Sequence, residues 1–104
     1  MGARFTMSHS YRDLMVWQKA IDLVTEICRC TQKFPASEIY GLTSQIRRSA
    51  VSVPSNVAEG QGRLSRGEFR QFLGHARGSN LELETQLIIA RNLNYVSEAE
   101  AEKR

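Results

Sequence analysis

The segment from Gly41 to Gly62 constrains the fold most, because its residue types repeat with the period of an α-helix. Its apolar residues recur at spacings of four, three and four, which places them on one face of a helix: Ile46, Ala50, Val53 and Val57. A second, partly apolar row lies about 100° further round the helix axis: Arg47, Val51, Pro54 and Ala58. We therefore expect one amphipathic helix here, with the first row in the core.

Short polar side chains occupy the opposite face of this helix. They follow a four-three-four-three spacing: Gln45, Ser49, Ser52, Asn56 and Glu59. An ordinary solvated face would hold Lys, Glu and Arg, which are better helix formers than Ser and Asn. Short side chains suit a surface that another molecule approaches closely. We therefore interpret this row as a candidate partner-docking face.

Pro54 lies well inside the central helix. Proline removes one backbone donor and its ring clashes with the carbonyl four residues earlier, here that of Ala50, at a cost of about 3 kcal/mol in a helix interior. The sequence thus predicts a kink or a break at this point. Either the helix curves around its core, or the kink aims the polar row at a partner.

A helix is predicted before the central segment, from Tyr11 to about Lys33, and Phe34-Pro35 ends it because proline disfavours a helical residue before it. Its apolar residues cover a wide arc: Leu14, Val16, Trp17, Ala20, Ile21, Leu23, Val24, Ile27 and Cys28. So wide an apolar surface needs cover on more than one side. We expect neighbours within the bundle and a contact with another copy of the chain.

A third helix is predicted from Arg66 to about Leu93. Ser65, followed three residues later by Glu68, forms a capping box that starts this helix. Asn92 to Asn94 should end it, since Asn tolerates the left-handed backbone conformation. Gly60 is expected to be the left-handed residue that ends the preceding helix.

Two further features concern the third helix and the segment after it. Gly74 and Gly78 lie in the middle of the helix, where each glycine costs up to about 1 kcal/mol relative to alanine, so we expect another helix to approach closely there. A second capping box, Ser97 with Glu100, predicts a short fourth helix. With no alternating β-branched runs in the sequence, we expect an all-α fold.

The length of 104 residues is that of a single domain. We assign residues 1–10 to a flexible leader and 11–104 to the bundle. Neither a signal-peptide pattern nor an apolar run of membrane-spanning length is present, so we expect a cytoplasmic protein without a membrane partner.

The positive charge is concentrated in the middle third of the chain. The net charge is +3, yet residues 40–81 hold six basic and two acidic groups, and all six basic residues are arginines. Arginine presents a planar fork that fits phosphate and carboxylate, so an anionic partner is favoured. A solvated face, or a genome rich in arginine codons, would also explain the pattern. The candidate nucleic-acid-binding residues are Arg47, Arg48, Arg63, Arg66, Arg70 and Arg77.

Chemistry-bearing residues are sparse. Cys28 and Cys30 are two apart, so on a helix they point away from each other and cannot share a metal. Glu59 has no nucleophile or metal partner at helical spacing, and the histidines His9 and His75 have no matched cysteine or paired carboxylate. We therefore expect no catalytic site, no bound metal and no cofactor.

Five stretches of the sequence together resemble a known family: YRDLMVW at 11–17, FPASEIYGL at 34–42, QIRRSAVSVPSNVAEG at 45–60, RLSRGEFRQFL at 63–73 and GSNLE at 78–82. The family is that of the small bacterial four-helix-bundle proteins first linked to intervening sequences in 23S ribosomal RNA genes. The resemblance covers about residues 11–95, and the run at 45–60 is its most specific part. Asn94 stands where the family usually has glycine, and the chain ends just after the fourth helix would begin.

The resemblance implies an all-α, antiparallel up-down four-helix bundle, here with three long helices and a short or truncated fourth. It also implies that the bundle assembles as a homo-oligomeric ring, typically a pentamer, without a catalytic site. The leading function it implies is binding of structured RNA or of DNA through a pooled basic surface, without sequence readout. The alternative is a protein-interaction adaptor, because the family is related to the accessory variability determinant proteins of diversity-generating retroelements, which assist a reverse transcriptase.

Overall fold

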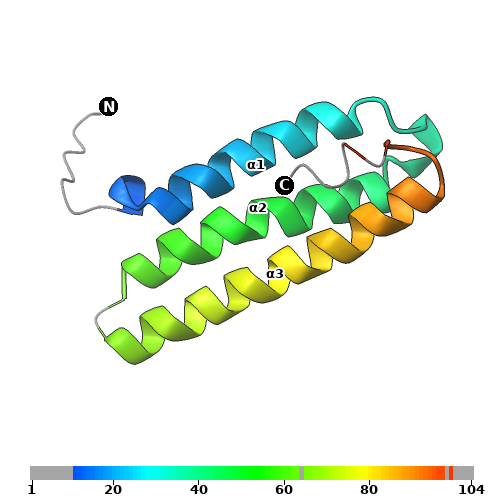
Figure 1. Ribbon diagram of the computed structural model, residues 1–104. Coiled ribbons are helices and arrows are strands. Elements are labelled where there is room, and N and C mark those ends of the chain that lie inside the picture. The colour runs from blue at the N-terminus through cyan, green and yellow to red at the C-terminus, as the bar shows by residue number, and fades with distance from the viewer. Residues whose placement is uncertain (1–10, 64, 98, 100–104) are drawn as a thin grey trace.

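The computed structural model describes residues 11–63, 65–97 and 99, and three α-helices account for most of them. A 3₁₀ turn, η2 (Tyr11–Asp13), precedes α1 (Met15–Thr31), and a second, η3 (Ala36–Glu38), precedes α2 (Leu42–Gln61), which α3 (Arg66–Asn92) follows. Figure 1 shows successive helices running antiparallel, with α2 between α1 and α3. The described residues contain no strand. The predicted all-α class is therefore confirmed.

Two predictions depend on residues that the structure does not describe. The leader at 1–10 lies outside the described residues, as does most of the segment after Ser97. The four-helix bundle is accordingly not confirmed, since the described part of the chain holds three α-helices. Among the described helices, none combines the length and apolar character needed to cross a lipid bilayer.

The first apolar row of the central segment forms the middle of the core. Ile46, Ala50 and Val57 are almost completely buried, while Val53 is half-buried. Leu83 and Leu87 of α3 pack into the same region, which is completed by Ile27, Phe34, Ala90 and Val96. The predicted core face of α2 is thus confirmed.

Helix α2 continues through Pro54 without a break. The side chain of Pro54 is buried, so its packing offsets part of the cost of the lost backbone hydrogen bond. The helix ends at Gln61, and the N–H of Gly62 donates to the carbonyls of Ala58 and Glu59. Of the predicted kink or break at Pro54, the break is therefore wrong, while a kink or curvature of the helix stays a prediction.

Gly60 lies inside α2 and not at a left-handed cap, since none of the described glycines has a positive φ. A Cβ atom at Gly60 would lie 2.8 Å from Cβ of Phe72 and 3.0 Å from Cδ1 of Phe69. The residue is glycine because α3 passes directly over it. The predicted left-handed conformation of Gly60 is wrong. Glycine is needed at this position because α2 and α3 are in close steric contact.

Two glycines of α3 also depart from their prediction. At Gly74 and Gly78 a Cβ atom would meet nothing within 4 Å, and both residues are exposed. The predicted close approach of another helix is therefore absent from the described part of the chain. These glycines lie on the outer face of α3, on the side away from α2.

Both predicted ends of α3 are confirmed. At its start, Oγ of Ser65 accepts a hydrogen bond from the backbone N–H of Glu68 at 3.1 Å. At its end, Asn94 has φ 64°, and the N–H groups of Asn94 and Tyr95 donate to the carbonyls of Arg91 and Ala90. These two bonds form a Schellman motif, which turns the chain back toward the core.

The turn after α3 brings Tyr95 onto the start of α2. Its ring packs on Phe34 with 5.3 Å between centroids, and its hydroxyl donates to Oε2 of Glu38 at 2.9 Å. The other carboxylate oxygen of Glu38 accepts from the N–H of Leu42 at 3.1 Å and so caps α2. These bonds lower the pKa of Glu38, the Leu42 bond most, and raise the pKa of Tyr95.

Gly60→Ala should destabilise the fold by about 1–3 kcal/mol, because the added methyl group overlaps Phe72 and Phe69. Gly67→Ala is the matched control: it lies in the first turn of α3, where a Cβ would have only ordinary contact with Ser65. We expect it to be neutral or to stabilise by up to about 1 kcal/mol. Urea unfolding of both variants measures the difference, and equal effects would contradict the packing account.

Tyr95→Phe should lower the free energy of unfolding at neutral pH, because Glu38 loses its phenol donor. A lowered folded-state pKa means that the Glu38 contribution is complete above the ordinary value of 4.5 and is lost as pH falls below it. A raised folded-state pKa means that the Tyr95 contribution is complete below 10.0 and is lost as pH rises above it. The stability gap between wild type and variant should therefore be widest between these values and narrow at both extremes. Urea unfolding of both proteins at several pH values measures this gap. A gap that does not change with pH would argue against the Tyr95–Glu38 hydrogen bond.

Candidate nucleic-acid interface

The side chain of Arg47 forms hydrogen bonds with α1 of the same chain. Its Nε donates to Oγ1 of Thr31 at 2.8 Å, and one terminal nitrogen donates to the carbonyl of Cys28 at 3.4 Å. The last four carbonyls of a helix lack helical partners, and a cation at this end is also favoured by the helix dipole. Arg47 is half-buried and joins α2 to the C-terminus of α1. The structure assigns it a positioning role in the fold.

Arg63 lies at the turn between α2 and α3. It forms an ion pair with Glu59, one helical turn earlier, at 3.1 Å, and its guanidinium carbon lies 4.8 Å from the centroid of the Phe72 ring. His75 flanks the same ring, with 5.8 Å between centroids. Arginine over an aromatic face is a favourable cation–π arrangement. Arg63 is therefore held in place and partly neutralised, with its side chain 41% exposed.

The remaining four arginines of the predicted set are exposed: Arg48, Arg66, Arg70 and Arg77. None of them forms a hydrogen bond or ion pair with another residue of the described part of the chain. Arg66 and Arg70 lie one turn apart at the start of α3, and Arg77 is seven residues further on. Arg63, Arg66 and Arg70 give the α2–α3 end of the molecule an excess of positive charge, and Arg77 extends it toward the middle of α3.

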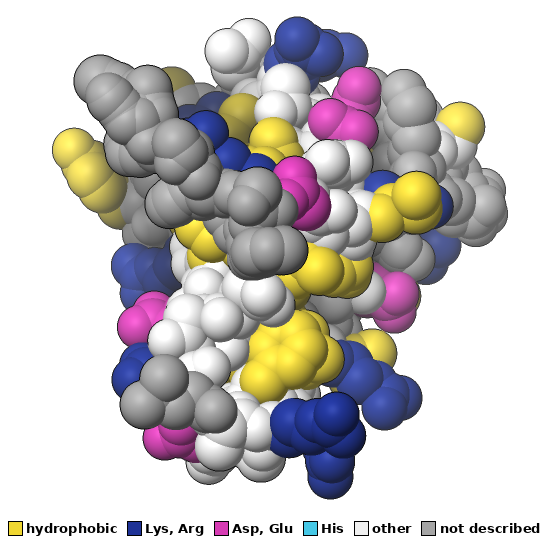
Figure 2. Space-filling model, turned by 90° about the vertical axis from the view of Figure 1, so that its left-hand side faces the viewer, with side chains coloured by type: hydrophobic (Ala, Val, Ile, Leu, Met, Phe, Trp, Pro, Cys, Tyr) yellow, Lys and Arg dark blue, Asp and Glu magenta, His cyan; other side chains and the backbone are white. Residues whose placement is uncertain are grey.

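The α2–α3 end also exposes hydrophobic surface. Figure 2 looks at this end of the molecule and shows Lys and Arg side chains beside a hydrophobic patch in its lower half. Phe69 and Phe72, both half-buried, lie in the first turns of α3. Guanidinium groups next to aromatic rings are the combination with which proteins hold nucleic-acid backbones and stack on bases.

One residue of the predicted docking row, Ser52, contacts α3 of the same chain. Oγ of Ser52 is 2.8 Å from Oγ of Ser79 in α3, and Nδ2 of Asn56 donates to the backbone carbonyl and the hydroxyl of Ser52. Ser49 is buried, whereas Gln45 and Glu59 at the two ends are exposed. At Ser52 the close approach is thus made by α3, and the role of the row in docking a partner stays a prediction. The sequence feature that could have indicated this contact is Ser79, a small polar residue of α3.

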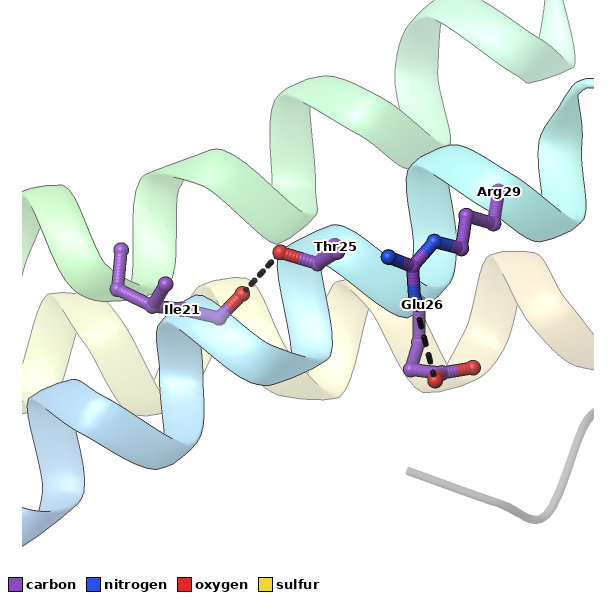
Figure 3. Close-up of polar contacts among 4 residues, drawn as sticks. All are labelled: Ile21, Thr25, Glu26 and Arg29. Atoms are coloured by element: carbon purple, nitrogen blue, oxygen red, sulfur yellow. Dashed lines mark hydrogen bonds and ion pairs between the residues drawn. The ribbon is translucent and has the colours of Figure 1, made fainter.

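The outer face of α1 is charged but balanced. Figure 3 shows Arg29 paired with Glu26, with 4.0 Å between the charged atoms, and the hydroxyl of Thr25 donating to the carbonyl of Ile21 at 3.0 Å. Arg29 lies near the end of α1, at the opposite end of the molecule from the α2–α3 turn. This face offers an exposed arginine without the aromatic neighbours found at the α2–α3 end.

Few residues bear on the prediction that the protein binds no metal ion and has no catalytic site. Cys28 and Cys30 are not joined by a disulfide bond, and both are of intermediate exposure. Within the described residues, no group of three or more His, Cys, Asp and Glu is placed to hold a metal ion. Glu59, the one carboxylate considered as a general base, is paired with Arg63.

A model of the family of 23S rRNA-intervening sequence proteins matches residues 12–104. The chain belongs to this family. The match includes all three helices, the arginines at the α2–α3 end and the Glu38–Tyr95 junction. A comparison with curated proteins gives no match.

Arg47→Ala should destabilise the protein by about 1–3 kcal/mol, because the Cys28 carbonyl and Thr31 lose a charged donor. The adjacent Arg48→Ala removes the same charge from an exposed side chain and should change stability by no more than about 0.5 kcal/mol. Chemical denaturation of the two variants provides the measurement. Equal destabilisation would contradict the positioning role of Arg47.

Proposed function

We propose that this protein is a non-catalytic, self-associating helical protein that binds nucleic acid, structured RNA or DNA, through its α2–α3 end. The observation that carries the proposal is the set of exposed arginines Arg66, Arg70 and Arg77, which have no carboxylate partner among the described residues. Arg48 is also exposed, but it lies near the start of α2, away from the α2–α3 turn. Arg63, held on Phe72, lies beside them.

The charge distribution favours a polyanion over a small anion or an acidic peptide. The arginines lie on an exposed surface and are spaced along α3 by four and seven residues. A polyanion gains from such a surface because each neutralised phosphate releases counterions. No arrangement of side chains suited to reading base edges accompanies the arginines among the described residues, so binding should depend on shape and charge. Family membership is consistent with a role close to RNA but does not specify a ligand.

Self-association supports the proposal because it would bring the positive charges of several chains to one ligand. A single chain carries only +3, and the arginines of this surface lie toward one end of it. In an oligomer, and in the pentameric ring that the family resemblance implies, several copies of this end would contact one polyanion. Linking several weak sites raises the overall affinity well above that of one site.

The adaptor alternative has less support. In its docking row, Ser49 is buried and Ser52 is bonded to Ser79 of α3, so a partner such as a reverse transcriptase would contact mainly Gln45 and Glu59 at the two ends of that row. The exposed arginines could instead meet acidic residues of such a partner. Nuclease treatment of a complex isolated from cells separates the two functions, because only a protein-held partner survives it.

Removing Arg66 and Arg70 together, as Arg66→Gln/Arg70→Gln, should weaken binding to a structured RNA hairpin and to duplex DNA. Each lost phosphate contact reduces the slope of log affinity against log salt by about 0.9 for duplex DNA, so the double variant should lose about 1.8 of that slope. Fluorescence anisotropy between about 50 and about 200 mM salt measures both quantities.

Arg29→Gln is the control: it removes one exposed arginine, paired with Glu26, from the opposite end of the molecule. It should leave the salt slope within experimental error of wild type. Binding by wild type that does not depend on salt, or a salt slope that the double variant leaves unchanged, would overturn the proposed function.

A further inference from the structure

The ring of Phe72 lies at the centre of a group of three planar side chains near the α2–α3 turn. The guanidinium carbon of Arg63 lies 4.8 Å from the centroid of this ring, and the centroid of the His75 ring lies 5.8 Å from it, with 31° between the ring planes. Phe72 is half-buried, whereas Arg63 and His75 are exposed. We call these three residues the Phe72 cluster. The cluster presents planar groups at the surface of the protein.

Contacts within the chain hold the Phe72 cluster in position. A Cβ atom at Gly60 would lie 2.8 Å from Cβ of Phe72, so Phe72 packs directly on the backbone of α2. Glu59 holds the guanidinium group of Arg63 through an ion pair at 3.1 Å. Side chains that are already ordered lose little conformational freedom when a ligand binds. The cluster is therefore preorganised for a ligand that contacts its planar groups.

His75 contributes more to this cluster than the turn requires. The cation–π contact between Arg63 and Phe72 by itself fastens the α2–α3 turn to α3. The His75 ring packs on Phe72, yet within the described part of the chain neither of its nitrogens has a hydrogen-bond partner. Imidazole nitrogens donate and accept hydrogen bonds. His75 therefore places a binding group for a ligand beside the aromatic ring.

The charges around the cluster disfavour a phosphate there. Glu59 neutralises Arg63, and Glu68 lies four residues before Phe72, on the same face of α3. Two carboxylates thus accompany one guanidinium group. A neutral planar ligand that carries N–H donors suits these surroundings better than an anion does.

We propose that the Phe72 cluster binds an unpaired nucleobase of the nucleic acid, while Arg66 and Arg70 bind phosphates of the same strand. Every base has a planar face that stacks on aromatic rings and guanidinium groups with little dependence on sequence. A base inside a duplex is covered on both faces by its neighbours and cannot stack on the protein. The inference rests on the proposed function and adds the class of ligand: nucleic acid with a loop, a bulge or a free strand.

The position of the arginines supports an unpaired strand. Arg66 and His75 are nine residues apart, which is about two and a half helical turns, so they lie on opposite flanks of α3. A strand that contacts both must pass around the first turns of a helix about 10 Å wide. Duplex DNA is too stiff for this path, because its persistence length is about 150 base pairs. A flexible unpaired strand can follow it.

Competition binding of the full chain tests the preference for unpaired bases. Fluorescence anisotropy at one salt concentration compares an RNA hairpin that has a loop of unpaired adenines with a blunt RNA duplex of the same stem sequence. Wild type should bind the hairpin about tenfold more tightly, which is within the range that stacking of one base provides. His75→Ala and Phe72→Leu should each remove most of this preference and leave the salt slope unchanged. Thr85→Ala, which removes an exposed polar side chain ten residues further along α3, is the control and should retain the preference.

A second measurement detects the stacking itself. The fluorescent adenine analogue 2-aminopurine, placed in the loop, loses emission when it stacks, so wild type should quench it and the two variants should quench it less. His75→Ala replaces an exposed side chain and keeps the test valid if Phe72→Leu fails to fold. Equal affinity of wild type for hairpin and duplex, or quenching that His75→Ala leaves unchanged, would overturn the stacking site. The salt-dependent titration of the arginines would then still stand, whereas a complete lack of binding would overturn both proposals.

Discussion

The fold depends on how closely α2 can approach α3. Where the helices come nearest their turn, Gly60 leaves room for Phe69 and Phe72, whose atoms would overlap any side chain at that position. Further along, Ser52 and Ser79 place hydroxyls 2.8 Å apart, which only short side chains on both helices permit. Toward the far end Ala50 and Ala90 are fully buried. Small residues thus line the contact, and the larger Ile46, Leu83 and Leu87 fill the space that opens beside it.

This contact also explains which features of the fold can be predicted from the sequence. The bounds of α3 follow from local chemistry, because Ser65 and Asn94 act on backbone groups within a few residues of themselves. The apolar row of α2 follows from periodicity alone. Gly60 cannot be predicted in the same way, because a glycine near a helix end is equally consistent with a left-handed cap and with a close contact. Only the position of Phe72 in another helix decides between them. Gly74 and Gly78 show the converse, since a glycine inside a helix is expected to mark contact and here marks the open face.

The arginines of the candidate site show the same limit, since contacts between helices cannot be read from the sequence alone. Arg47 and Arg48 are adjacent and chemically identical, yet the first is joined to Thr31 and the Cys28 carbonyl while the second is exposed. The helix period distinguishes their faces, but it does not show that the C-terminus of α1 lies within reach of one of them. Arg63, Arg66 and Arg70, by contrast, can be grouped from the sequence because they are close together and flank a short turn. Residues whose partners lie on other helices cannot be grouped in this way.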